Sequence, residues 1–258
     1  MRRKLRNITP HGQNFKTLRT AAEGESLKNE ILQTGDSSCK VCYNELFKKQ
    51  KGAFMFEGFS QEALDFLNDI RFNNHQQFYE ANRTRYEQYV KAPLRELSEE
   101  LAPAVQLIDP RLDTQPGRTM SRIRRDTRYT KDKSPFRDHV WLGWRYPGEG
   151  RAEGFHMYWG FGADWLGWGC GSYYTDKPMM DALRLEIRRH PDEVRRAVMP
   201  LEARFTIYGE DYKKIAVPAD VPEDLKPLYV KKYVGFEHNG TQEEWTLLYT
   251  HAMADVIT

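Results

Sequence analysis

The residues that could do chemistry gather in one stretch, residues 118–139, which we call the basic loop. It contains eight basic and three acidic side chains, a local charge of +5 in a chain whose total is +2. Arginine offers a planar fork that binds phosphate or carboxylate bidentately, and lysine adds a compact positive charge. Because cations this close repel one another, an anionic ligand or an internal acidic surface must compensate them.

The first interpretation is an anion site. Alternation along a strand over 120–125 would place Arg122 and Arg124 on one face, with Ile123 and Arg125 on the other. A turn is expected over 130–135, since proline fixes its own φ and pushes the preceding residue to an extended state. The expected ligand residues are Arg122, Arg124, Arg125, Arg128, Lys131, Lys133, Ser134 and Arg137.

The alternative interpretation is structural. The loop acids Asp126, Asp132 and Asp138 would pair with neighbouring arginines, and acids elsewhere would hold the remaining cations. The chain beyond residue 53, without the loop, carries a net charge of −9 and has acids in excess. An acidic surround disfavours long nucleic acids, so a small anion is the preferred partner and nucleic acid the less favoured one. A nucleic-acid or protein-binding module and an enzyme acting on a phosphorylated substrate, such as a hydrolase, stay as alternatives.

Acid–base chemistry has three candidates: Asp126, His139 and His156. A histidine that touches a carboxylate can act as a general base, whereas a histidine beside aromatic residues is more often a hydrogen-bonded structural residue. The sequence contains neither a G-x-S-x-G nucleophile motif nor a phosphate-binding G-x-x-x-x-G-K-[ST] loop. Cys39 and Cys42 have zinc-ligand spacing without further ligands, so no metal and no cofactor is expected.

The elements that must position these residues follow from periodicity. Helices are expected over 61–71, 75–90, 93–107, 176–189, from 191 onward and over 243–257; short aromatic strands over 141–146, 154–161 and 165–168. This order predicts an α+β fold, an antiparallel aromatic-rich sheet with helices N-terminal and C-terminal to it. Asn73 and Asn74 separate the first two helices. They are expected either to cap the second helix or to place a buried amide that orients the basic loop.

The tryptophans allow two interpretations. Trp141, Trp144, Trp159, Trp165 and Trp168 could stack nucleobases beside the arginines, but their period-2 placement favours a sheet core. The polar, basic residues 1–54 are interpreted as a disordered tail, a leader or a mis-assigned start, and residues 55–258 as a single domain. The sequence contains no run of about 18 apolar residues, so no transmembrane helix is expected. Its three cysteines favour a reducing, cytoplasmic location.

Residues 122–139, Arg-Ile-Arg-Arg-Asp-Thr-Arg-Tyr-Thr-Lys-Asp-Lys-Ser-Pro-Phe-Arg-Asp-His, closely resemble the signature of the DUF2461 family. Segments 59–67, 73–82 and 169–178 fit the same family, and the resemblance extends from about residue 56 toward the C-terminus, more loosely after 200. It implies a domain identity. It implies no activity, substrate or catalytic residue.

Overall fold

The computed structural model describes residues 56–128, 130–150 and 154–257. Contacts between residues divide them into two units. The first, the loop unit, contains residues 56–148, 156–170 and 237–257; the second, the helical unit, contains residues 149–150, 154–155 and 171–236. The single domain expected over 55–258 stays a prediction, and the expectations for residues 1–54 concern residues outside those described.

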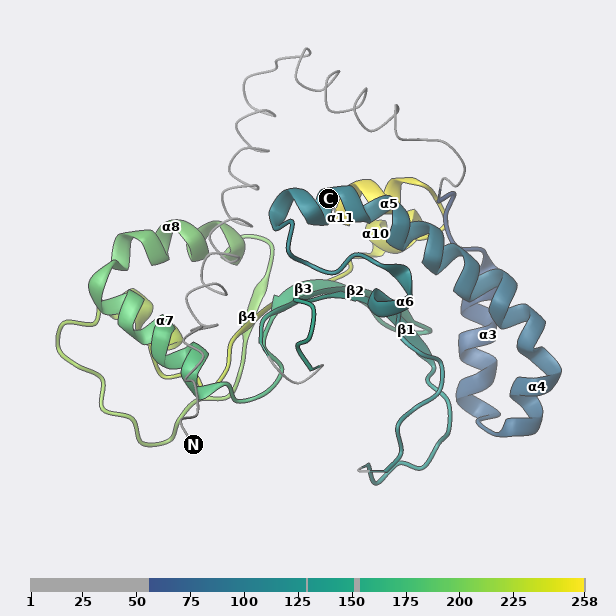
Figure 1. Cartoon of the computed structure of the whole chain (residues 1–258), viewed down its shortest axis with the longest axis horizontal. Helices are drawn as coiled ribbons and strands as arrows, with labels where there is room; N and C mark the ends of the chain where they lie inside the picture. The colour runs from purple at the N-terminus through teal and green to yellow at the C-terminus, as the bar shows by residue number, and fades with distance from the viewer. Residues whose placement is uncertain (1–55, 129, 151–153, 258) are drawn as a thin grey trace, which may run out of the picture. The chain divides into compact units, whose positions relative to one another are not determined.

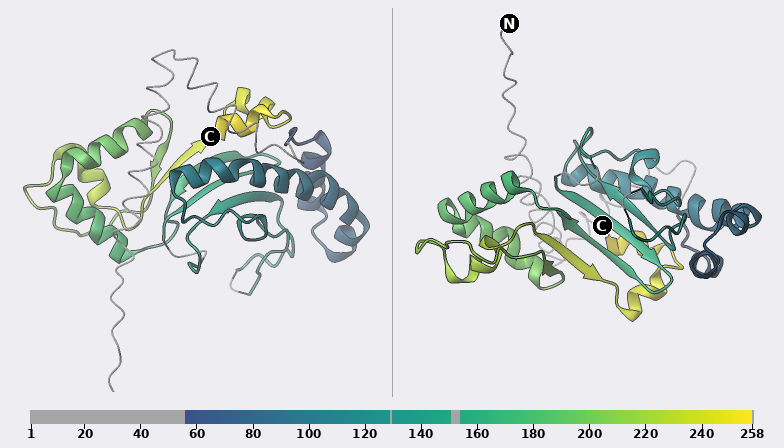
Figure 2. Two further views of the ribbon diagram at one scale, coloured as in Figure 1. Left: turned by 45° about the horizontal axis from the view of Figure 1, so that its top comes forward. Right: turned by 90° about the horizontal axis from the view of Figure 1, so that it is seen from below.

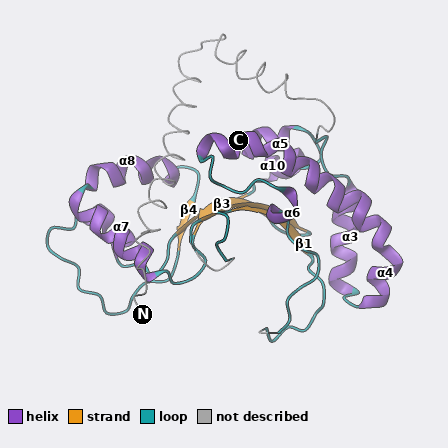
Figure 3. Cartoon of the chain, in the orientation of Figure 1, coloured by secondary structure: helices purple, strands orange, loops and turns teal. Residues whose placement is uncertain are grey.

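The loop unit opens with helices and continues with strands (Figures 1 and 3). Its helices are α3 (Gln61–Phe72), α4 (Gln76–Arg85), the π-helical η1 (Tyr86–Lys91), α5 (Ala92–Ile108), α6 (Pro116–Thr119), α10 (Gln242–Leu247) and α11 (Ala252–Ile257). Its strands are β1 (His139–Trp144), β2 (His156–Gly162) and most of β3 (Leu166–Gly171) and β5 (Gly235–Asn239).

The helical unit holds α7 (Lys177–Arg189), α8 (Pro191–Glu202), β4 (Thr206–Tyr208), the 3₁₀ turn η2 (Glu223–Leu225) and α9 (Lys226–Tyr229). Helix α7 packs against both α8 and α9. The buried Arg184 of α7 donates from Nε to the Tyr229 carbonyl at 2.9 Å and from its guanidinium to the Lys231 carbonyl at 2.5 Å. These bonds satisfy a buried cation with backbone oxygens, which makes Arg184 a structural residue.

The strands form one five-stranded antiparallel sheet in the order β1-β2-β3-β5-β4, which confirms the predicted α+β class. Within the loop unit, the burial of β1 alternates residue by residue. Val140, Leu142 and Trp144 are buried on one face, and Phe161 and Trp159 lie opposite the first two in the register. This face packs under helices, because α5 contacts β1 and α3 contacts β2. Figure 2 shows α5 running along the sheet.

The other face of β1 carries His139, Trp141 and Gly143. Opposite the first two in β2 stand Gly162 and Gly160. A Cβ built on Gly160 would lie 2.7 Å from the Trp141 Cβ, so any larger residue at position 160 would clash with Trp141. This face therefore begins at His139, the last residue of the basic loop, and glycines lie opposite His139 and Trp141 in the neighbouring strand.

Two helix predictions need correction. The helix expected over 75–90 is α4 followed by the wider turns of η1, which continue into α5 without an extended residue between them. The last helix, expected over 243–257, is two helices. It breaks because the Leu248 carbonyl accepts a hydrogen bond from the Phe59 N–H at 2.9 Å. That carbonyl lies at the C-cap of α10, and the chain restarts as α11 at Ala252. Among the described residues, no helix is long and apolar enough to cross a membrane.

Candidate anion-binding site

The basic loop consists of an outgoing and a returning arm, and the returning arm leads into β1 (Figure 1). Isolated bridges join Met120 to Leu142 and Arg124 to Phe136, in place of the continuous strand expected over 120–125. The Arg137 N–H donates to the Ile123 carbonyl at 2.8 Å and holds the arms together between those bridges. Within the outgoing arm, Arg122 and Arg124 are exposed and Ile123 is buried, as alternation predicts.

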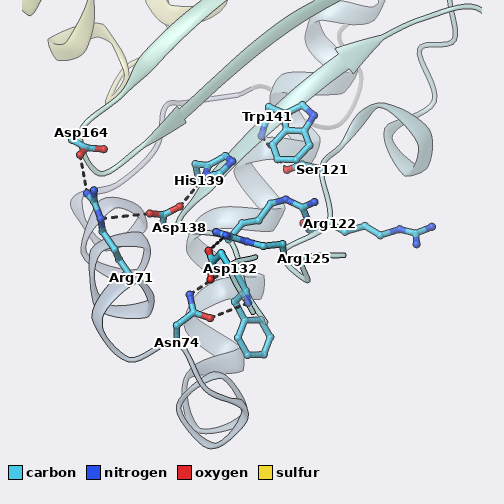
Figure 4. A network of polar contacts seen from close by, with 12 residues as sticks. Arg71, Asn74, Ser121, Arg122, Arg125, Asp132, Asp138, His139, Trp141 and Asp164 are labelled. Carbon is cyan, nitrogen blue, oxygen red and sulfur yellow. Dashed lines mark hydrogen bonds and ion pairs between the residues drawn. The ribbon is translucent and has the colours of Figure 1, made fainter. Parts of the chain in front are cut away.

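Asn74 fastens the returning arm to the helices. Its Nδ2 donates to the Phe136 carbonyl at 3.0 Å, and its Oδ1 accepts from the Phe136 N–H at 2.9 Å (Figure 4). One side chain thus makes both hydrogen bonds that a neighbouring strand would make. The cap of α4 is instead His75, whose Nδ1 accepts from the Phe78 N–H at 3.2 Å. The amide therefore supports the loop, the second of the two interpretations given for it.

Arg124 lies on an aromatic platform. The ring of the fully buried Phe136 stacks on Tyr79 with centroids 4.5 Å apart. The Arg124 guanidinium carbon lies 5.2 Å from the Phe136 centroid and 5.8 Å from that of Tyr79, and Nη2 donates to the Gln76 Oε1 at 3.1 Å. These contacts anchor the arm through cation–π attraction. The ligand role expected for Arg124 stays a proposal.

The expected turn near the loop tip is organised by Asp132. Its Oδ1 accepts from the Ser134 N–H at 2.9 Å, its carbonyl accepts from the Thr130 hydroxyl at 2.7 Å, and its Oδ2 pairs with the Arg125 guanidinium. The hydrogen bonds from Ser134 hold the pKa of Asp132 below its usual value against desolvation, and the Arg125 charge lowers it further. Ser134 and Arg125 are therefore already engaged inside the loop, with Lys133 donating from Nζ to the Thr127 carbonyl at 2.7 Å.

The Asp126 carboxylate is bound by the side chain of Arg128. The Arg128 Nε and Nη2 donate to the two carboxylate oxygens of Asp126 at 3.0 and 2.7 Å. This bidentate bond lowers the pKa of Asp126 to about 2. The carboxylate is then ionised and weakly basic at neutral pH, which disfavours it as a general base. His156 is buried at the first position of β2. Of the three acid–base candidates, His139 alone combines a carboxylate partner with an exposed ring, at 39% side-chain exposure.

The charges of the loop are only partly compensated. Three of its cations have carboxylate partners in exposed ion pairs: Arg118 with Asp113, Arg125 with Asp132 and Arg128 with Asp126. Four others have no carboxylate within ion-pair distance in the part of the chain that the structure describes: Arg122, Arg124, Lys131 and Lys133. Among the described residues outside the loop, Asp113 is thus the one acid that pairs with a loop cation, although the structural interpretation required more.

Arg137 and His139 meet at Trp141, a partly exposed residue of β1. The Arg137 guanidinium carbon lies 5.0 Å from the Trp141 ring centroid, and Nη1 donates to the Arg122 carbonyl at 2.8 Å. The His139 ring stacks on Trp141 at 5.5 Å and 25°. Figure 4 shows Arg122 extending away from this group, toward the solvent side of the loop.

The five tryptophans of the expected aromatic cluster divide between core and surface. Trp144, Trp159 and Trp168 are buried in the sheet core, as their spacing favoured. Trp141 and Trp165 are partly exposed, so only these two could stack a ligand base. Among the described residues, no group of three or more histidine, cysteine and acidic side chains could hold a metal. Cys39 and Cys42 lie outside the described residues.

Sequence reasoning missed two residues of this site. Arg71, at the end of α3, lies with Nε 3.5 Å from the Asp138 Oδ2 and with Nη1 2.8 Å from the Asp164 Oδ2. Ser121 accepts from the Trp141 N–H through its hydroxyl at 3.0 Å. Ser121 lies within the basic loop but was not among the expected ligand residues, and the contact between Arg71 and Asp138 spans 67 positions of sequence. Only the fold brings these residues together.

Comparison with known proteins agrees with the resemblance noted from the sequence. The model of a family described as conserved hypothetical proteins (DUF2461) matches residues 62–252. This match includes the whole basic loop, Asn74 and the strands of the loop unit. No curated protein and no solved structure matches the chain. Because the family model covers well over half of the sequence, the chain belongs to the DUF2461 family.

Proposed function

We propose that the basic loop binds a small phosphate-bearing or carboxylate anion. The observation that supports this proposal is the charge left over after internal pairing. Arg122, Arg124, Lys131 and Lys133 lack carboxylate partners among the described residues, although the loop is fixed by backbone bridges and by Asn74. A fixed group of uncompensated cations is stabilised by an anion that they share.

The ligand atoms differ in availability. The side chains of Arg122 and Lys131 make no hydrogen bond or ion pair within the described residues, so their donors are open to a ligand. Lys133 uses one donor on the Thr127 carbonyl, and an ammonium has two more. Arg125 and Arg128 sit in exposed ion pairs, which are worth about 0–1 kcal/mol each and can be rearranged by a ligand. Ser134 is the weakest candidate, because Asp132 holds it.

A small ligand fits better than a polymer. The cations lie on one short ribbon, and two loop acids, Asp126 and Asp132, remain on its surface beside them. A nucleic acid that contacts many phosphates would meet these acids as well. A single phosphate group would contact only the open donors. The cytoplasmic location expected from the cysteine count remains part of this proposal.

The test is a thermal-shift screen of the full chain against phosphate, pyrophosphate, sugar phosphates, dicarboxylates and short oligonucleotides. Site binding raises the melting temperature by mass action. The expected result is a rise with one anion class that is lost in Arg122→Ala and kept in Arg196→Ala. Arg196 is a matched control, because it is exposed on α8 in the helical unit.

Salt dependence separates the alternatives. Binding of one phosphate group predicts a shallow fall in affinity with salt, whereas a nucleic-acid module predicts a slope of roughly 0.9 per phosphate contacted. Absence of any rise in either protein, or an equal rise in Arg122→Ala and Arg196→Ala, would refute the anion site at the loop.

A further inference from the structure

Asp138 and His139 are consecutive in sequence, yet their side chains meet. The His139 Nδ1 lies 2.8 Å from the Asp138 Oδ1. Consecutive residues of a regular strand point to opposite faces. Here the alternation is interrupted, because three residues separate Met120 from Arg124, whereas five separate the facing Leu142 and Phe136. The returning arm thus contains a bulge of two residues, and bulges re-aim side chains at functional sites.

The Asp138 carboxylate is held from behind by Arg71. The Arg71 Nε lies 3.5 Å from the Asp138 Oδ2, and Asp164 fixes the same guanidinium through a 2.8 Å contact (Figure 4). Burial alone would raise the pKa of Asp138, but the hydrogen bond to His139 and the charges of His139 and Arg71 outweigh it and leave the pKa below its usual value. An ionised carboxylate can only accept a hydrogen bond, so the His139 Nδ1 carries the proton and donates it to Asp138.

That assignment leaves the lone pair of His139 on Nε2. No described residue makes a hydrogen bond to this atom. The ring is placed by stacking on Trp141 and by the edge of Trp165, 6.5 Å away at 85°. The residue opposite His139 in the register is Gly162, which has no side chain to cover the ring. In the neutral ring, Nε2 therefore carries a positioned lone pair that is open to a ligand.

The base and the cations share one neighbour. Arg137, a ligand candidate, lies over Trp141, and His139 stacks on the same indole. A ligand held by Arg137 beside Trp141 can thus present a reacting group to Nε2. His75 and His238 lack this arrangement, because the His75 Nδ1 accepts from a backbone N–H and the His238 Nε2 is bound to Glu244 at 2.7 Å.

We propose that His139 is the general base of a hydrolytic site for a phosphate ester bound at the basic loop, with Asp138 and Arg71 as positioning residues. This inference rests on the proposed function and names its chemistry. Nε2 takes a proton from water as the water oxygen forms a bond to phosphorus. The bond between phosphorus and the ester oxygen breaks on the opposite side, the departing alkoxide takes a proton from water, and Nε2 returns its proton to the solvent, which yields an alcohol and inorganic phosphate.

The test measures the reactivity of Nε2 directly. The full chain is treated with diethyl pyrocarbonate, and the rate of carbethoxylation of each histidine is followed by peptide mass spectrometry. His139 is expected to react at least tenfold faster than His75, whose Nδ1 lone pair is engaged although the residue is exposed. Asp138→Asn is expected to slow His139 about tenfold, and Arg71→Gln to slow it less.

Protection by inorganic phosphate links the base to the anion site. Phosphate is expected to slow His139 and leave His251 unchanged. His251 is a matched control, because its side chain is 36% exposed against 39% for His139 and its Nδ1 lies 2.8 Å from a backbone carbonyl. A rate for His139 no greater than that of His75, or no protection by phosphate, would overturn the inference.

The two proposals can fail separately. If anions stabilise the chain through Arg122 while His139 reacts like an ordinary exposed histidine, the binding function stands and the base is refuted. If Asp138→Asn does not fold, Arg71→Gln still tests how the carboxylate is positioned, because it removes the cation that contacts Asp138. Equal reactivity of His139 in Arg71→Gln and in the natural chain would then contradict the positioning role of Arg71.

Discussion

Replacing Asn74 by alanine should loosen the basic loop at its attachment point. The variant loses two hydrogen bonds to Phe136, at 3.0 and 2.9 Å, and leaves a partly buried carbonyl and N–H without those partners. Each bond contributes about 1 kcal/mol net, and an unsatisfied buried group costs about 1–3 kcal/mol. We therefore expect a loss of about 2–3 kcal/mol in the free energy of unfolding, measured by urea denaturation.

Two neighbouring variants make the test specific. Asn73→Ala removes only an exposed bond from Nδ2 to the Asp69 carbonyl at 3.0 Å and should cost less than about 1 kcal/mol. Asn74→Asp keeps the acceptor for the Phe136 N–H and loses the donor, so it should fall between Asn74→Ala and the natural chain. A cost for Asn74→Ala no larger than that of Asn73→Ala would refute the idea that this amide holds the loop.

Two further predictions concern stability. Gly160→Ala should destabilise the chain by about 1–3 kcal/mol, since the added Cβ would lie 2.7 Å from the Trp141 Cβ, whereas Gly143→Ala, with no atom closer than 3.8 Å, should be near neutral in the same urea assay. Equal losses of stability in the two variants would contradict the close approach of Gly160 to Trp141. Asp109 is buried and its pKa is held well below its usual range by the Arg111 side chain, against opposing burial. Its contribution to stability is thus present above about pH 4 and is lost as the pH falls through the lowered pKa. Unfolding measured from pH 6 down to pH 2 should show a smaller acid loss in Asp109→Asn, and an unchanged loss would refute the assignment.

The elements of the fold were predictable where periodicity was strong. Helix α3 begins and ends within one residue of its prediction because its apolar positions repeat at helical spacing. The aromatic strands β1 and β2 were predictable because each is a short run rich in aromatic residues that also contains glycine. The break between α10 and α11 was not, since it depends on a hydrogen bond from Phe59, almost two hundred residues away.

In the candidate site too, local features were predictable and tertiary contacts were not. Its charge density is local, so the sequence located the basic loop and its exposed arginines. The roles within it depend on tertiary partners: Arg124 lies on Phe136 and Tyr79, and Asp138 faces Arg71. Spacing alone cannot show which cation keeps a carboxylate partner. A bulge that turns Asp138 toward His139 also leaves no mark in the composition of the strand.

The central claim is that the basic loop binds a small anion, and calorimetric titration of the full chain tests it most directly. Phosphate and pyrophosphate are titrated into the natural chain, the Arg122→Ala/Lys131→Ala double variant and the Arg196→Ala control. The account predicts saturable binding in the natural chain and the control, weakened at least tenfold in the double variant. Binding of equal strength in all three proteins, or in none, would contradict it.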